Sequence, residues 1–167
     1  MKIEKIAVFG AGTMGSAIAQ HFCMKGLAVT IVDLKPEALE RSVAMIRRSL
    51  EEAKDKKVLS EEALHAALAR VKCTTNLADI ANSDLVVEAV FEDRKVKKEL
   101  FKTLENHFSP GCILASNTSS FLISDLALDL KHPERFVGVH YFYHAAKNKL
   151  VEVIPGKKTN PDLASEL

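Results

Sequence analysis

Short apolar runs alternate with amphipathic segments along most of the chain. The apolar runs are rich in β-branched residues and end at glycine, proline or polar residues, which is typical of buried strands in a parallel sheet. Between them, apolar residues recur every three or four positions, which predicts helices. Strands are expected at 2–9, 27–32, 71–74, 85–90, 112–115, 136–141 and 150–154, and helices at 13–25, 36–53, 60–70, 93–108, 123–127 and 161–167. In the helix at 93–108, the face expected to be buried carries Val96, Leu100, Phe101 and Leu104.

This order of elements predicts an α/β protein of the Rossmann type, with a doubly wound, mostly parallel sheet and helices on both faces. Parallel neighbours need crossover connections, and these connections are usually helical. A lysine-rich break at 54–57 interrupts the helical pattern within residues 36–70. Two helices in that region are therefore expected to form a hairpin-like excursion from the sheet.

The composition fits one globular domain. The 167 residues are 47% hydrophobic and 27% charged, and no apolar run approaches the length of a membrane span. The net charge of +1 gives no global field that would attract nucleic acid or an anionic membrane. No secretory leader is apparent, so a cytoplasmic protein is expected, and a continuation beyond Leu167 stays open.

Three cysteines, Cys23, Cys73 and Cys112, lie far apart in the sequence. They lack the Cys-x-x-Cys spacing of a zinc or redox site, so no metal site is expected. We expect all three to be buried free thiols.

The first apolar run leads directly into Gly10-Ala11-Gly12-Thr13-Met14-Gly15 and then into a helix. In this strand, turn and helix context, Gly10 suits the tight turn, Gly12 allows a pyrophosphate to approach the backbone, and Gly15 allows the helix to pack on the strand. Unpaired N–H groups at the start of the helix favour an anion there. The pattern predicts a dinucleotide site that includes Thr13 and Met14, although a purely structural glycine turn stays open.

Asp33 ends the second predicted strand, eighteen positions after Gly15. An acid at this place can accept hydrogen bonds from both ribose hydroxyls and would repel a 2′-phosphate. The pattern therefore favours NAD over NADP, although the nearby Lys35 could soften that discrimination.

Four further segments stand out: Glu88-Ala89-Val90-Phe91-Glu92-Asp93, Ser116-Asn117-Thr118-Ser119-Ser120, Arg135-Phe136-Val137-Gly138-Val139-His140 and Leu150-Val151-Glu152-Val153-Ile154. Their order and spacing closely resemble the NAD-binding domain of the 3-hydroxyacyl-CoA dehydrogenase family, and the resemblance covers residues 5–154. It implies the reversible oxidation of an L-3-hydroxyacyl-CoA to a 3-ketoacyl-CoA, with the hydride passing to NAD.

Oxidation of a secondary alcohol needs a base for the hydroxyl proton, and His140 is the candidate. It closes a predicted strand at the carboxyl end, where α/β sheets bind ligands, and imidazole exchanges protons near neutral pH. Glu152 lies in the next predicted strand, where its carboxylate could orient the ring. The resemblance places the family's catalytic histidine on His140 and its partner on Glu152. It also places a substrate-binding hydroxyl on Ser119, whereas the rest of that polar segment is interpreted as a turn.

The resemblance implies further ligand contacts. Glu92 and Lys97 match positions that contact the cofactor, and Ser49 and Lys56 match positions that contact coenzyme A. Surface charges, or a solvated helix end at the lysine run, remain alternatives for these residues.

The chain departs from the family in two ways. Tyr143-His144 stands where the family usually has Asn-Pro, so the role of that asparagine does not carry over. The family also continues into a helical domain that mediates dimerisation and closes over the substrate, so residues 1–167 are interpreted as the N-terminal domain of a longer enzyme that dimerises only with the helical domain present. Two alternatives stay open: a non-catalytic NAD-binding module, and a dehydrogenase for a different hydroxy acid or thioester.

Overall fold

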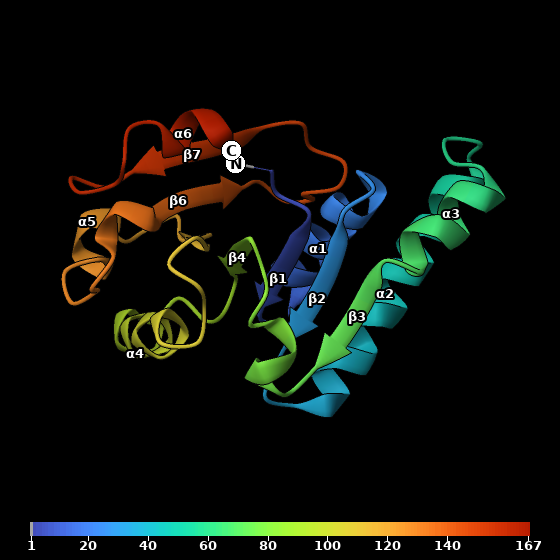
Figure 1. Cartoon of the computed structure of the whole chain (residues 1–167). Coiled ribbons are helices and arrows are strands. Elements are labelled where there is room, and N and C mark those ends of the chain that lie inside the picture. The colour runs from blue at the N-terminus through green and yellow to red at the C-terminus, as the bar shows by residue number, and fades with distance from the viewer. Residues whose placement is uncertain (1) are drawn as a thin grey trace.

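A twisted sheet of seven strands forms the centre of the computed structural model, which describes residues 2–167 (Figure 1). The strand order is β3-β2-β1-β4-β5-β6-β7. The strands are β1 (Lys5–Phe9), β2 (Ala28–Val32), β3 (Val71–Thr74), β4 (Leu85–Glu88), β5 (Ile113–Ser116), β6 (Phe136–Tyr141) and β7 (Val151–Pro155). All neighbouring strands are parallel except β6 and β7.

Helices cover both faces of this sheet. The α-helices are α1 (Thr13–Met24), α2 (Pro36–Asp55), α3 (Glu61–Leu68), α4 (Arg94–Glu105), α5 (Ile123–Leu126) and α6 (Leu163–Glu166), and the 3-10 helices are η1 (Leu77–Ile80) and η2 (Pro133–Arg135). Figure 1 shows α2 and α3 beside β3, at the opposite edge of the sheet from α5 and β7. The doubly wound architecture and the helical excursion within residues 36–70 are thus confirmed.

Alternating side chains of the central strands enter two separate cores. In β1, Ile6 and Val8 pack with α1, α2 and α3, whereas Ala7 and Phe9 pack with α4 and α5. This is the period of two that a strand buried on both faces requires. Both faces of the central strands are therefore packed with apolar side chains. Polar side chains can lie close together at the carboxyl edge of the sheet.

The last connection is too short for a crossover. Nine residues, 142–150, join β6 to β7 without a helix, and this length allows only an antiparallel return. The return places His140 opposite Glu152 in the register of the two strands.

Two expectations about burial were wrong. Val96 is 49% exposed, and the stripe of α4 that faces the core is Lys97, Phe101 and Leu104, at spacings of four and three. Cys73 is exposed on β3 at the edge of the sheet, whereas Cys23 and Cys112 are buried as expected. In both cases the position of the element relative to its neighbours, which local periodicity does not contain, decided the outcome.

Candidate functional site

The glycine turn joins β1 to α1 at the carboxyl edge of the sheet. Gly10 has a φ of +99°, and its N–H donates to the carbonyl of Val32 on the neighbouring strand at 2.9 Å. A Cβ on Gly15 would lie 1.8 Å from the carbonyl oxygen of Gly10, so helix and turn pack too closely for any side chain. By contrast, a Cβ on Gly12 would meet nothing within 4 Å. The protein itself does not require glycine at this position, and the space beside it fits a pyrophosphate at the start of α1.

Asp33 holds this turn from the end of β2. Its Oδ2 accepts a hydrogen bond from the Ala11 N–H at 2.9 Å, and its Oδ1 accepts one from the Lys35 N–H at 3.0 Å. Each carboxylate oxygen has a second lone pair, so both can also accept hydrogen bonds from a ribose. The residue expected to bind the ribose therefore also stabilises the glycine turn.

His140 and Glu152 form a hydrogen-bonded pair. The Nδ1 of His140 lies 2.8 Å from Oε2 of Glu152, and the ring of Phe142 packs against the imidazole with 4.6 Å between centroids. The His140 side chain is 19% exposed and that of Glu152 50%. Because Nδ1 is engaged, Nε2 is the nitrogen left to exchange a proton with a ligand.

The polar turn after β5 presents Ser119. The Thr118 hydroxyl accepts hydrogen bonds from the N–H groups of Ser120 and Phe121, at 3.2 and 3.1 Å. The Asn117 side-chain oxygen accepts one from the Tyr141 N–H at 2.8 Å. Ser119 is left exposed at the tip. Asn117, Thr118 and Ser120 thus form the turn, as expected, whereas Ser116 is the last residue of β5 and not part of the turn. Asn117 fixes the turn to the strand that carries His140.

A buried ion cluster lies under this turn. The Lys97 ammonium is 2.6 Å from Oε1 of Glu88 and 3.0 Å from Oε2 of Glu92. The Ser116 hydroxyl donates to the other oxygen of Glu88 at 2.7 Å, and the Thr118 hydroxyl donates to Glu92. The cluster therefore joins the end of β4, the start of α4 and the turn that carries Ser119.

Burial of the Glu92 carboxyl would by itself raise its pKa. The hydrogen bond from Thr118 and the contact with Lys97 outweigh that effect and hold the pKa below its ordinary value. Glu92 is consequently ionised at neutral pH.

A family model described as "3-hydroxyacyl-CoA dehydrogenase, NAD binding domain" matches residues 5–167. The chain belongs to this family. It is 41% identical over 160 residues to a probable 3-hydroxybutyryl-CoA dehydrogenase of Deinococcus radiodurans, covering 96% of this chain and 57% of the relative.

The fold is also similar to that of solved structures. The 3-hydroxybutyryl-CoA dehydrogenase of Escherichia coli K12 is 36% identical with a TM-score of 0.97, and the match covers 99% of this chain and 35% of that one. A diketoreductase described as acting on dicarbonyl compounds is 29% identical with a TM-score of 0.91, over 99% and 59% of the two chains. The chain thus spans between 35% and 59% of the length of these relatives.

Of the two positions that the dehydrogenase resemblance assigns to coenzyme A, Ser49 lies in α2 and Lys56 follows directly after the helix. Ser49 accepts a hydrogen bond from the Gln20 amide of α1 at 3.0 Å, and Lys56 is exposed at the end of α2. Lys97, which the resemblance assigns to the cofactor, is only 1% exposed and points into the ion cluster.

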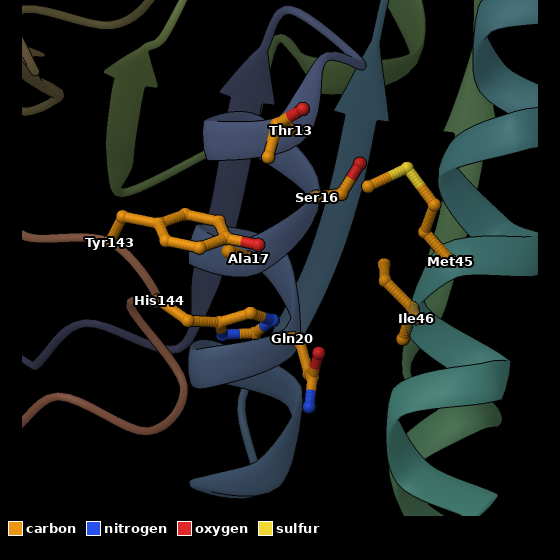
Figure 2. A pocket seen from close by; sticks show the side chains of 8 residues that line it. All are labelled: Thr13, Ser16, Ala17, Gln20, Met45, Ile46, Tyr143 and His144. Carbon is orange, nitrogen blue, oxygen red and sulfur yellow. The ribbon is translucent and has the colours of Figure 1, made fainter. Parts of the chain in front are cut away.

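A shallow pocket separates α2 from the loop after β6 (Figure 2). Its lining comes from α1 (Thr13, Ser16, Ala17 and Gln20), α2 (Met45 and Ile46) and the loop (Tyr143 and His144). Figure 2 shows the rings of Tyr143 and His144 reaching from the loop across α1. Burial, together with the charge of Lys147, lowers the pKa of His144, so this ring is neutral at pH 7. The two residues that depart from the family therefore form one wall of this pocket.

No role for Glu88 is predicted from the sequence. The usable signal was an acid at the end of an apolar strand, because a buried carboxylate needs a cation and Lys97 follows on the next helix. Among residues 2–167, no group of three or more His, Cys, Asp or Glu residues is placed to hold a metal ion. Over the same range, no helix has both the length and the apolar character that crossing a bilayer demands.

Proposed function

We propose that this chain is the NAD-binding, base-carrying part of an enzyme that interconverts L-3-hydroxyacyl-CoA and 3-ketoacyl-CoA. The observation that carries the proposal is the His140–Glu152 pair, with 2.8 Å between Nδ1 and Oε2, at the same edge of the sheet as the glycine turn. A base next to a dinucleotide site is what alcohol oxidation requires.

The residues of the turn fit NAD. The space beside Gly12 would take the pyrophosphate, the N-terminus of α1 would stabilise its charge, and Asp33 would accept hydrogen bonds from the ribose. Thr13, Met14 and Glu92 complete the proposed contacts, and Lys97 would act on the cofactor through Glu92. When bound, NAD supplies the acceptor for the hydride that leaves the carbinol carbon.

Residues of the chain accept and return the proton of the substrate hydroxyl. Nε2 of His140 takes the proton of the substrate hydroxyl, and Glu152 stabilises the resulting imidazolium through Nδ1–H. The exposed Ser119 hydroxyl donates a hydrogen bond to the substrate oxygen, which it can do for alcohol and ketone alike. In the reverse direction His140 returns the proton.

Ser49 and Lys56 are proposed to contact the coenzyme A portion of the substrate, since an exposed ammonium suits its phosphates. We further propose that residues 1–167 form a single domain of a longer enzyme in which a helical domain completes the site and mediates dimerisation. The partial coverage of relatives supports this domain assignment.

The test is the acetoacetyl-CoA-dependent oxidation of NADH by the wild type, His140→Gln and the control His107→Gln, which changes an exposed histidine at the end of α4. His140→Gln should abolish turnover while the NADH affinity stays at the wild-type value, and His107→Gln should be fully active. Equal rates for wild type and His140→Gln would overturn the proposal. A silent wild type that still binds NADH would leave two possibilities, a dehydrogenase that needs the helical domain for turnover and a non-catalytic NAD-binding module.

The wall formed by Tyr143 and His144, together with the likeness to the diketoreductase, favours one second candidate: a dehydrogenase for a different carbonyl or hydroxy acid substrate. Rates with acetoacetyl-CoA, free 3-hydroxy acids and 1,3-diketones distinguish the two. Turnover confined to substrates without coenzyme A would replace the main proposal by this one.

A further inference from the structure

The ion cluster under the Ser119 turn does not balance its charges. Glu88 and Glu92 share one cation, Lys97, which leaves one negative charge. Arg94, the nearest other basic side chain in sequence to Glu92, pairs instead with Asp125 at 2.8 Å. The structure therefore keeps a net charge of −1 in this cluster.

Only one member of the cluster reaches solvent. The side chains of Glu88 and Lys97 are 0% and 1% exposed, whereas that of Glu92 is 40% exposed. The buried pair is also the tighter contact, at 2.6 Å against 3.0 Å. The charge of Lys97 is therefore compensated mainly by the buried Glu88. The remaining negative charge lies on the partly exposed Glu92.

Glu92 and Asp33, the acid proposed to bind the ribose, lie on opposite sides of the proposed dinucleotide site. Asp33 follows β2, the glycine turn follows β1, and Glu92 follows β4, and these strands are ordered β2-β1-β4. A dinucleotide whose adenosine ribose contacts Asp33 and whose pyrophosphate crosses the turn extends towards β4 and β5. Its nicotinamide end would therefore lie on the side of Glu92.

We propose that the Glu88–Lys97–Glu92 cluster makes this site discriminate between the two redox states of the cofactor, binding oxidised NAD more tightly relative to NADH than a neutral cluster would. The nicotinamide ring is a cation when oxidised and neutral when reduced, so a net negative charge favours the oxidised form selectively. This inference rests on the proposed function. It makes Glu88, which is fully buried, a specificity-determining residue.

The size of the effect follows from Coulomb's law. Two unit charges about 6 Å apart, in surroundings with an effective dielectric constant of about 40–80, change an equilibrium roughly three- to tenfold. Removal of the negative charge at either end of the cluster should shift this equilibrium in the same direction.

The experiment measures the dissociation constants of NADH and NAD for the 167-residue chain and three variants. The chain has no tryptophan, so the emission of NADH itself reports binding, and NAD is measured by displacement of NADH. Glu92→Gln and Glu88→Gln should each raise the ratio of the NAD to the NADH dissociation constant by about three- to tenfold. Ser116→Ala removes a hydrogen bond to Glu88 without changing the charge, so it should leave the ratio unchanged.

Each result supports or overturns the inference. A merely structural role for Glu88 would weaken both nucleotides equally and leave the ratio constant, which would overturn it. So would an equal shift in Ser116→Ala, because packing and not charge would then be responsible. If circular dichroism shows that Glu88→Gln does not fold, Glu92→Asp takes its place in the test. This variant keeps the negative charge at position 92, so the inference requires it to retain the wild-type ratio. A wild type that binds neither nucleotide overturns the proposed function itself.

Discussion

Asn117 and Tyr141 connect the two halves of the candidate catalytic site, through a 2.8 Å hydrogen bond from the Tyr141 N–H to the Asn117 side-chain oxygen. This bond fixes the turn that carries Ser119 to the strand that carries His140. The Asn117 amide therefore helps to fix the distance between the two groups that would act on the substrate.

Asn117→Ala should lower turnover about 10- to 100-fold, because small displacements of reacting groups are costly, while the NADH affinity is retained. The matched control is Asn106→Ala, which removes two hydrogen bonds, to Lys102 and Lys131, at the far end of α4. Steady-state rates with acetoacetyl-CoA and NADH titrations check this prediction. An active Asn117→Ala variant, or equal losses in both variants, would contradict it.

The glycine turn allows binding to be separated from folding. Gly12→Ala should fold with nearly wild-type stability, because nothing lies within 4 Å of the added Cβ, but its NADH affinity should fall at least about tenfold since the methyl group occupies the proposed pyrophosphate space. Gly15→Ala should instead be strongly destabilised, because its Cβ would meet the Gly10 carbonyl at 1.8 Å. Thermal unfolding and NADH fluorescence measure the two effects. Unchanged NADH affinity in Gly12→Ala would remove that residue from the site.

Asp33→Asn should weaken NADH binding about tenfold and NADPH binding less, because the amide loses the charge that repels a 2′-phosphate and can accept only through one oxygen. The control Glu37→Gln removes an equal charge from the exposed first turn of α2. Titration with both reduced cofactors checks the prediction. Equal affinities of Asp33→Asn and Glu37→Gln for NADH would refute the ribose assignment.

Lys97→Met should cost about 3–5 kcal/mol of unfolding free energy, because it leaves Glu88 charged and unpaired in the core. The double variant Glu88→Leu/Lys97→Met should recover most of this loss. Lys98→Met is the control, since it removes a partly exposed pair with Asp129 at 3.3 Å, worth about 0–1 kcal/mol. Urea unfolding followed by circular dichroism measures all three. A double variant as unstable as Lys97→Met would show that packing, not charge, dominates.

The three thiols should differ in reactivity. Burial raises the pKa of Cys23 to about 11 and that of Cys112 to about 12, whereas Cys73 is exposed. A thiol reagent at pH 8 should therefore label one cysteine in the folded chain and three after denaturation. Because thiols of the unfolded chain ionise near their ordinary value of 9.0 while the buried two stay protonated, the unfolding free energy should fall as pH rises from about 9 towards 12. Rapid labelling of more than one cysteine would contradict the burial.

Local patterns in the sequence were sufficient to predict most of the strands and helices of this protein and part of its candidate site. The apolar runs indicated buried strands and the helical periodicity indicated crossovers, because both patterns depend on the faces that an element must bury. The glycine turn, Asp33 and the pairing of His140 with Glu152 could be inferred as well. Turn geometry needs particular residues at particular positions, and a short connection fixes which strands meet.

Only the tertiary structure decided which charged and apolar side chains are buried. The helical pattern predicted that Val96 is buried, yet the fold exposes Val96 and buries Lys97. Lys97 can be buried because Glu88 from a neighbouring strand and Glu92 from a loop compensate the charge of its ammonium group. Cys73 is exposed because β3 is an edge strand, a position that strand order alone determines. Hydrophobic periodicity reports one element at a time, whereas the burial of a charge depends on partners that other elements supply.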